Sequence, residues 1–268
     1  MRILVTNDDG IEAAGIAELA AIAADTGWDV VVAAPSGERS GSAAALSAVE
    51  SDAGVLTDPV EFSAAPNAAA FGVHASPALI SVLASAGTFG PPPDLMISGI
   101  NHGPNTGTAV LHSGTVGAAF TAAIRGVPAI AFSFAPPAPS TWKTAVTVAR
   151  HVLHWATEKA ASGHLSPVVL NINIPDVPAE ELRGLRSAHL AMFGAAQAQV
   201  TTPDATETVT MSQTAAEPDP TSDAALLAAG WATVTPVMAP CEVAADLPGL
   251  TGSLTGSLTG SVPILSGD

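Results

Sequence analysis

The sequence predicts an α/β protein with a doubly wound, mostly parallel, Rossmann-like sheet. Up to residue 174, short apolar runs alternate with alanine- and leucine-rich segments of helical length. Glycine or proline marks most of the junctions between them. Strands separated by helices favour parallel pairing through crossover connections. Beyond Pro175 the alternation stops, which predicts an extended or hairpin excursion before a last helix and strand.

The amino-terminal elements follow from local composition. Ile3, Leu4 and Val5 read as a short buried strand, and the turn residues Asn7 to Gly10 end it. The next segment has the alanine and leucine content of a helix, and WDVVVAA is a second strand stopped by Pro35. The expected bounds are a helix at 11–24, a strand at 28–34, weak strands or irregular structure at 53–72, and a helix at 77–86.

The central elements continue the alternation. PPPDLMISGIN predicts a strand at 95–98 that ends in a glycine turn, and SGTVGAA opens a helix at 115–125 with Gly126 as its carboxyl cap. Further elements are expected as strands at 128–134 and 167–174, a helix at 141–161, a short helix at 223–229 and a last strand at 231–237. We therefore expect a catalytic core at 1–190, an excursion with the last helix and strand at 191–240, and a flexible low-complexity tail at 241–268.

Composition excludes several classes of protein. The chain has 268 residues and 48% hydrophobic residues, but no window of about 18 uninterrupted apolar residues, so we expect no membrane span. The amino terminus lacks the layout of a secretion signal, which predicts a cytoplasmic protein. Cys241 is the only cysteine, so no intramolecular disulfide can form. The net charge of −16 argues against binding to nucleic acid or to anionic membranes.

Polar, glycine-flanked loops are expected at one edge of the sheet. They contain Asp8 and Asp9 after the first strand, Ser40 after the second, and Asn101 after the strand at 95–98. Adjacent carboxylates repel each other unless a cation lies between them. Two carboxylates with neutral oxygens from Ser40 and Asn101 suit one hard divalent cation, Mg²⁺ or Mn²⁺.

The SGTV segment offers a second anchor for an anionic ligand. Ser113 can cap the helix that follows it, and Gly114 lets an anion approach the N–H groups of the first turn. A phosphate held between the cation and this helix end would be poised for attack by water. One of the two aspartates, Asp9 in preference to Asp8, would orient or deprotonate that water.

As an ordered set, these motifs resemble the SurE family of survival-protein nucleotidases. The resemblance rests on NDDG, APSGERSG, SGINHGPNTG and SGTVGAA, with VLNINIPDVP and GWATVTPV later in the chain. It implies a metal-dependent phosphomonoesterase that acts on nucleoside 5′- and 3′-monophosphates and forms a homodimer or homotetramer. By this resemblance the four metal ligands are Asp8, Asp9, Ser40 and Asn101, with Asp8 and Asp9 catalytic. The phosphate-binding residues implied are Gly41, Asn105, Ser113, Gly114 and Thr115.

Departures from the family pattern leave a second interpretation open. Ala43, Ala44 and Ala45 replace polar residues, Ala109 replaces an acidic residue, and His112 stands at a tyrosine position. These changes are compatible with a protein that binds metal and nucleotide with little or no turnover. A dinucleotide-dependent oxidoreductase is disfavoured, because the first turn reads NDDG where such enzymes have a glycine-rich fingerprint.

Overall fold

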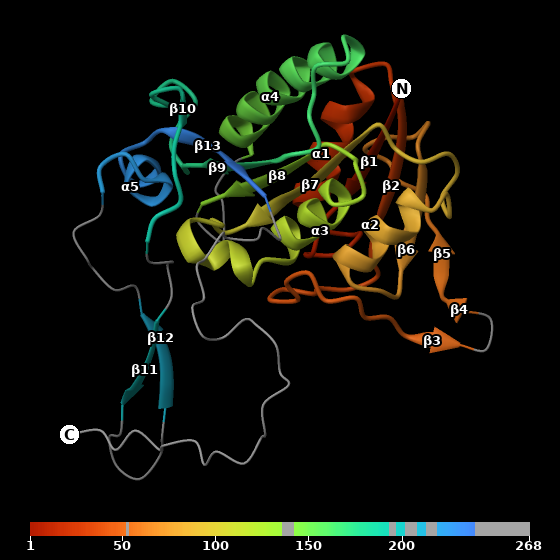
Figure 1. Ribbon diagram of the computed structural model, residues 1–268, viewed down its shortest axis with the longest axis horizontal. Coiled ribbons are helices and arrows are strands. Elements are labelled where there is room, and N and C mark those ends of the chain that lie inside the picture. The colour runs from red at the N-terminus through yellow and green to blue at the C-terminus, as the bar shows by residue number, and fades with distance from the viewer. Residues whose placement is uncertain (52–53, 136–141, 193–196, 202–207, 213–218, 239–268) are drawn as a thin grey trace, which may run out of the picture.

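The computed structural model describes residues 1–51, 54–135, 142–192, 197–201, 208–212 and 219–238. Within them a nine-stranded sheet is covered by helices on both faces, as Figure 1 shows. The strand order is β10-β13-β9-β8-β7-β1-β2-β6-β5. The six central strands (β9, β8, β7, β1, β2 and β6) are parallel to one another. The strands β5 and β13 run antiparallel to β6 and β9, their inner neighbours. The predicted mostly parallel sheet is therefore confirmed.

The nine strands of this sheet are short and mostly buried. Their bounds are β1 (Arg2–Thr6), β2 (Asp29–Pro35), β5 (Thr57–Pro59), β6 (Ala69–Val73), β7 (Leu95–His102), β8 (Ala129–Phe134), β9 (Val169–Ile174), β10 (Leu185–Ser187) and β13 (Ala232–Val237). Two antiparallel pairs lie outside it: β3 (Glu50–Ser51) with β4 (Gly54–Val55), and β11 (Gln197–Thr201) with β12 (Thr208–Ser212). The second pair is the hairpin that was expected after Pro175.

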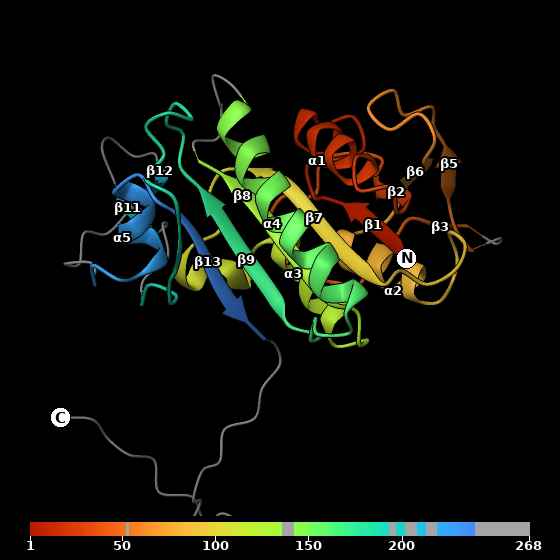
Figure 2. The same cartoon turned by 90° about the horizontal axis from the view of Figure 1, so that it is seen from above.

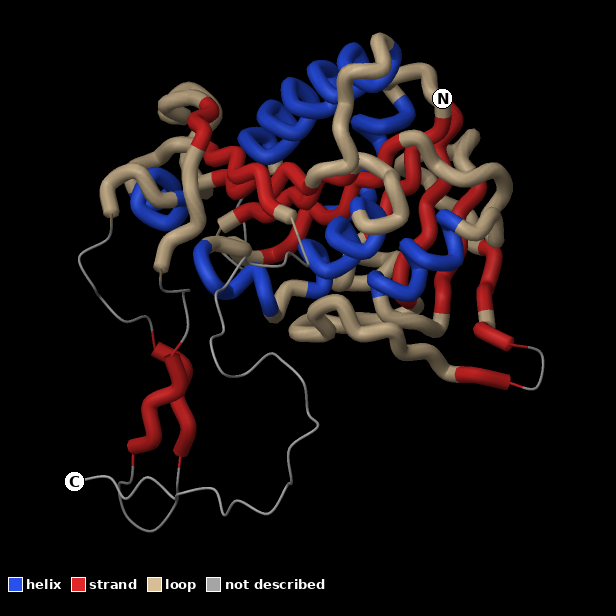
Figure 3. The backbone as a smooth tube through the Cα atoms, in the orientation of Figure 1, coloured by secondary structure: helices blue, strands red, loops and turns tan. Residues whose placement is uncertain are grey.

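Two helices pack on each face of the sheet. The helices are α1 (Ala14–Ala24), α2 (Pro77–Ser85), α3 (Gly114–Ala123), α4 (Lys143–Ala161) and the short α5 (Asp223–Ala228), with a 3₁₀ turn η1 (Gly107–Leu111). Figures 2 and 3 show α1 and α4 on one face and α2 and α3 on the other. Alternation along β1 explains the two layers, because Ile3 and Val5 join one apolar cluster and Leu4 joins the other.

The strand order places a topological switch point between β1 and β7. From β1 the chain builds outward through β2 and β6, and then returns to pair β7 with the opposite side of β1. In open α/β sheets the crevice at the carboxyl ends of two such strands is the usual place for a ligand. Asp8 and Asp9 directly follow β1, and Asn101 lies near the end of β7.

Two expected boundaries are wrong for identifiable reasons. The helix expected from residue 11 begins at Ala14, because Gly10 has a φ of 102° and the Ile11 N–H donates to Pro35 O at 2.8 Å. The strand expected at 95–98 continues to His102. Gly99 (φ 129°) sits in an irregularity of the β7–β8 register and lets the strand continue, so Asn101 is a strand residue and not a turn residue.

Helix α3 ends at Ala123 with Ile124 as its carboxyl cap, two residues before the expected end, and the predicted glycine stop follows it. Gly126 has a φ of 84°, its N–H donates to Ala123 O at 2.9 Å, and the Val127 N–H donates to Ala122 O at 3.1 Å. No helix in the described part of the chain is long and apolar enough to cross a membrane. Cys241 and the repeat from Leu250 lie outside the described residues.

Candidate metal and phosphate site

The turn after β1 is closed by a buried asparagine. Asn7 donates from Nδ2 to Gly10 O at 2.8 Å and accepts the Gly10 N–H on Oδ1 at 3.1 Å. The Arg39 N–H donates to Asp8 O at 2.7 Å, which fastens this turn to the loop after β2. The two loops that carry the predicted acids and the predicted serine are thus joined by the backbone.

Asp8 is a buried carboxyl group at the amino end of α3. Its side chain accepts a hydrogen bond from the Thr115 hydroxyl, and the Thr115 N–H also donates to it. Burial raises the pKa of Asp8 to about 6, the Thr115 hydrogen bonds oppose that rise, and the charge of Asp9 adds to it. Thr115, predicted to bind phosphate, is therefore placed where it orients Asp8.

Asp9 is a second carboxyl group whose surroundings disfavour the charged form. Burial is the main cause that raises its pKa, Glu38 raises it further, and His102 lowers it through its charge and its backbone N–H. Oδ2 of Asp9 is buried and has no hydrogen-bond partner among the described residues. An unpaired buried oxygen beside a second acid is the arrangement that a bound cation would relieve.

The two predicted neutral ligands differ in their surroundings. Asn101 is partly buried on β7, and its Nδ2 donates to Gly103 O at 2.8 Å. Ser40 is exposed, and its Oγ donates to Glu38 Oε1 at 2.8 Å. Gly41 is exposed with a φ of 75°. Glu38, which sequence reasoning did not single out, therefore holds the hydroxyl that was expected to face the aspartates.

The amino end of α3 meets Asp8 at very close range. Ser113 caps the helix, because its Oγ accepts the Val116 N–H at 3.1 Å. A Cβ atom on Gly114 would lie 2.7 Å from Asp8 Oδ2 and 2.7 Å from Ser42 Oγ. Only glycine therefore fits at this position, because the side chains of Asp8 and Ser42 pack directly against the first turn of the helix.

Asn105 is anchored inside the protein by its backbone and its side chain. Its N–H donates to Asn173 Oδ1 at 2.8 Å, and its carbonyl accepts from Asn171 Nδ2 at 2.8 Å and Asn173 Nδ2 at 3.0 Å. Its own Nδ2 donates to Ser133 Oγ at 2.8 Å. Asn105 therefore fixes the loop that leads to η1 and α3.

Sequence reasoning missed this anchoring set. Asn171 and Asn173 lie two apart in an otherwise apolar strand, so they share one face of β9. Two asparagines at that spacing within an apolar run are the signal in the sequence that would have identified them. Both side chains are fully buried in the structure, where amide groups need hydrogen-bond partners. Asp223 adds a second anchor, because its carboxylate accepts the Gly107 N–H at 2.9 Å and the Ala191 N–H at 2.9 Å.

The donor set limits which cation fits. In the described part of the chain, no three His, Cys, Asp or Glu side chains gather closely enough to hold a metal. A cation at this site would therefore rest on two carboxylates supplemented by neutral oxygens, as Mg²⁺ and Mn²⁺ do. The buried, unpaired Oδ2 of Asp9 fits that role.

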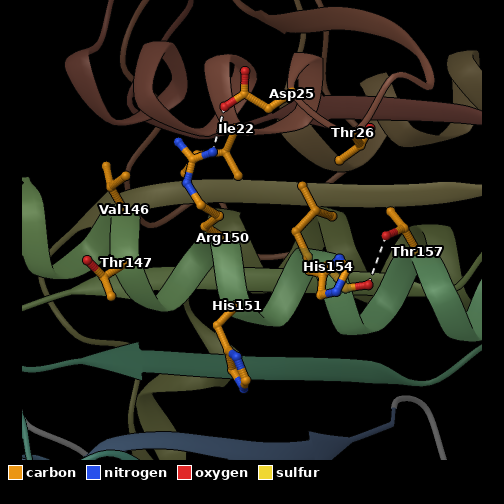
Figure 4. A pocket seen from close by; sticks show the side chains of 10 residues that line it. Ile22, Asp25, Thr26, Val146, Thr147, Arg150, His151, His154 and Thr157 are labelled. Carbon is orange, nitrogen blue, oxygen red and sulfur yellow. Dashed lines mark hydrogen bonds and ion pairs between the residues drawn. The ribbon is translucent and has the colours of Figure 1, made fainter.

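A separate pocket lies between α1 and α4, as Figure 4 shows. Its walls include Arg150, which pairs with Asp25 at 2.6 Å, and the exposed side chains of His151 and His154. None of the predicted site residues lines it. The candidate site is therefore the group of residues at the carboxyl ends of β1 and β7 and not this pocket.

Comparisons with known proteins place the chain among relatives of one kind. The sequence profile of the family described as "Survival protein SurE" matches residues 3–197. The chain is 36% identical over 193 residues to 5′-nucleotidase SurE of Heliobacterium modesticaldum, covering 71% of this chain and 67% of that protein. It is 32% identical over 187 residues to 5′-nucleotidase SurE 1 of Burkholderia lata, covering 69% and 68%.

Other matches are shorter, or rest on structure. With 5′-nucleotidase SurE of Methylococcus capsulatus the identity is 37% over 89 residues, which span only about a third of that relative's length. The crystal structure of the SurE protein from Aquifex aeolicus superposes with a TM-score of 0.71 at 26% identity, covering 89% of this chain and 93% of that one. The similarity in structure extends over nearly the whole of both chains.

Proposed function

The chain belongs to the SurE family, and we propose that it is a phosphomonoesterase that hydrolyses nucleoside 5′-monophosphates, and also 3′-monophosphates, to nucleoside and phosphate. The relatives that match two thirds of their own length carry the name 5′-nucleotidase. The proposal extends their named activity to this chain through the residues of its own site.

One observation carries the proposal. Asp8 and Asp9 lie at the switch point of the sheet with raised pKa values, and Gly114 brings the amino end of α3 into close contact with Asp8. A cation that these acids would hold and the helix amino end next to them are two features that would attract a phosphate group. The net charge of −16 makes such a local source of positive potential necessary for an anionic substrate.

The residues divide the work of binding and proton transfer. We propose that Asp8 and Asp9, with Ser40 and Asn101, hold one Mg²⁺ or Mn²⁺ ion; Ser40 would have to leave Glu38 to do so. When bound, such an ion supplies a Lewis acid for the phosphoryl oxygens and lowers the pKa of a water molecule. Thr115 keeps Asp8 oriented, and the amino end of α3, with Ser113 and Gly114, receives the phosphate oxygens together with Gly41 and Asn105.

Asp9 is the better candidate for the base. Its Oδ2 has no hydrogen-bond partner, whereas Asp8 is engaged by Thr115. Its raised pKa also makes it a more effective proton acceptor near neutral pH than an ordinary aspartate. Asp9 would therefore orient the attacking water and accept its proton.

Phosphate release tests the proposal. Hydrolysis of p-nitrophenyl phosphate and of nucleoside monophosphates is measured with Mn²⁺ and with EDTA. We expect metal-dependent turnover that falls by about 100-fold or more in Asp8→Asn and in Asp9→Asn, because each removes charge that stabilises the transition state. Glu12→Gln, an exposed acid three residues from Asp9, serves as the control and should keep full activity. Near-normal hydrolysis by both aspartate variants would contradict the assigned roles.

A second candidate is a protein that binds metal and nucleotide with little turnover. The engagement of Ser40 by Glu38 favours it, because that contact occupies a predicted metal ligand. Metal-dependent nucleotide binding without phosphate release would identify this case. We also propose a homodimer or homotetramer, which light scattering of the purified protein would test.

A further inference from the structure

A histidine at the edge of the candidate site has no role in the function proposed above. His102 is exposed, directly follows the predicted ligand Asn101, and is the last residue of β7. Its N–H donates to the Asp9 carboxylate, and its side chain is close enough for its charge to lower the pKa of that acid. The imidazole ring is therefore accessible to solvent next to the acids that we propose to hold the metal.

The His102 ring is the outermost of three rings in contact. Its centroid lies 5.3 Å from that of Trp142, and the Trp142 centroid lies 5.8 Å from that of Phe134, with interplanar angles of 36° and 40°. These distances are typical of favourable aromatic contacts. Phe134 is fully buried, Trp142 is half-buried and His102 is exposed, so the three rings lead from the core of the protein to the edge of the site.

The backbone holds the His102 ring in place. His102 and Phe134 are partners in the register of β7 and β8, and the Gly103 N–H donates to Phe134 O at 2.9 Å. Trp142 immediately precedes α4 and packs against the apolar cluster on the α1 and α4 side of the sheet. A ring that is already held in this way loses little freedom when a ligand binds against it, which favours binding.

We propose that His102 is a substrate-binding residue, whose imidazole ring stacks on the nucleobase of a nucleoside monophosphate. The inference rests on the proposed function and deepens it, because the residues assigned above account for the metal and the phosphate but not for the base. Every nucleobase has a flat face that can stack on a ring, so this contact predicts that both purine and pyrimidine nucleotides bind. A nucleobase is uncharged, so the net charge of −16 does not oppose the contact.

A comparison of two phosphate esters tests the inference. Adenosine 5′-monophosphate and ribose 5-phosphate both carry a phosphate on a ribose, and only the first has a base. The ratio of their kcat/KM values cancels the effect of a substitution on the metal or on the acids, because both esters depend on them. We expect His102→Ala to lower this ratio about tenfold, the usual effect of losing one stacked base.

Two further variants separate stacking from charge. His102→Phe keeps a flat ring but has no titratable nitrogen, so it should retain most of the ratio. His164→Ala, which changes an exposed histidine beyond the end of α4, is the matched control and should show the ratio of the parent. Melting temperatures near that of the parent establish that the variants fold.

The outcomes distinguish this inference from the proposed function. If the parent hydrolyses both esters and the ratio is unchanged in His102→Ala, the stacking role is wrong and the function stands. A ratio that falls equally in His102→Ala and His102→Phe also overturns the stacking role. If the parent releases phosphate from neither ester, the proposed function fails.

Calorimetry with adenosine 5′-monophosphate and Mn²⁺ decides the inference in that case, and also for a parent that hydrolyses only one of the esters. Binding that weakens about tenfold in His102→Ala and is retained in His102→Phe supports the stacking role. Equal binding by the parent and both variants, or binding by none of them, overturns it.

Discussion

At the scale of single residues, the site stores unfavourable electrostatics. Burial is the first cause of the raised pKa values of both Asp8 and Asp9, and each acid is also near another negative charge. Hydrogen bonds from Thr115 and His102 oppose these effects without removing them. The folded chain therefore holds two carboxyl groups in a place that, without a cation, favours the protonated form more than water does.

Asp8→Asn should stabilise the metal-free protein at neutral pH. The pKa of Asp8 in the folded state, about 6, exceeds the ordinary aspartate value of 3.8, so the folded protein binds more protons than the unfolded chain between these two pH values. Stability from this group consequently falls as the pH rises through that range, by about 3 kcal/mol when complete. Urea unfolding in EDTA at pH 7 should show Asp8→Asn to be more stable, by up to this amount, and the difference should shrink toward pH 4. A less stable Asp8→Asn at pH 7 would show that its hydrogen bonds outweigh the charge.

The sequence predicts which residues belong to the candidate site, but not the positions and hydrogen-bond partners of their side chains. The adjacency of Asp8 and Asp9 and the cap of Ser113 follow from local sequence, and the structure places them at one edge of the sheet. The hydroxyl of Ser40 could not be placed, because its partner Glu38 depends on the path of an irregular loop. Thr115 likewise reaches Asp8 only through a contact 107 residues apart in sequence.

At the scale of elements, β9 supports the site through a polar pair inside an apolar strand. Asn173 makes two hydrogen bonds to the backbone of Asn105, and Asn171 makes one. These bonds connect the sheet to the segment that enters η1 and then α3. The strand thereby supports the candidate site through Asn105.

Asn173→Ala should destabilise the fold more than Asn171→Ala. The first change leaves two buried backbone groups of Asn105 with fewer partners, at about 1–3 kcal/mol each, and the second removes one bond to a carbonyl that keeps another. Urea unfolding should therefore show roughly twice the loss for Asn173→Ala. An equal or larger loss for Asn171→Ala would mean that the Asn105 carbonyl depends mainly on that residue.

The elements themselves were largely predictable because their signals are local. Apolar runs fixed β1, β2, β8 and β9 to within one or two residues, and Gly126 marked the end of α3. The exception is β7, where Gly99 was read as the end of the strand. Gly99 lies where the register of pairing between β7 and β8 shifts. Such a shift depends on both strands, so it cannot be predicted from the sequence of one of them.

At the scale of the whole molecule, charge is the dominant feature. With 24 acidic and 8 basic residues, the chain repels itself and repels a phosphorylated substrate at low salt. The site counters this repulsion locally, through the amino end of α3 and the cation that we propose. The effect of salt on the overall charge repulsion and the effect of a metal ion bound at the site should therefore be distinguishable by experiment.

Salt and divalent metal should stabilise the protein by different routes. Raising NaCl from about 20 mM to about 200 mM shortens the range of charge repulsion from roughly 20 Å to below 10 Å, so the melting temperature should increase for the parent and for Asp8→Asn alike. Mn²⁺ at matched ionic strength should add a further increase only in the parent. Equal gains from Mn²⁺ in both proteins would indicate screening alone.

Because β1 pairs with β2 on one side and with β7 on the other, Ile3 has partners at Val30 and at Leu95. A nascent chain that has emerged only as far as residue 94 can form the first of these pairings and cannot form the second. Closing so long a loop is entropically slow. Asp8 is thus synthesised 107 residues before Thr115, the residue whose hydroxyl donates to it, so the surroundings of this acid are completed long after the acid itself has left the ribosome.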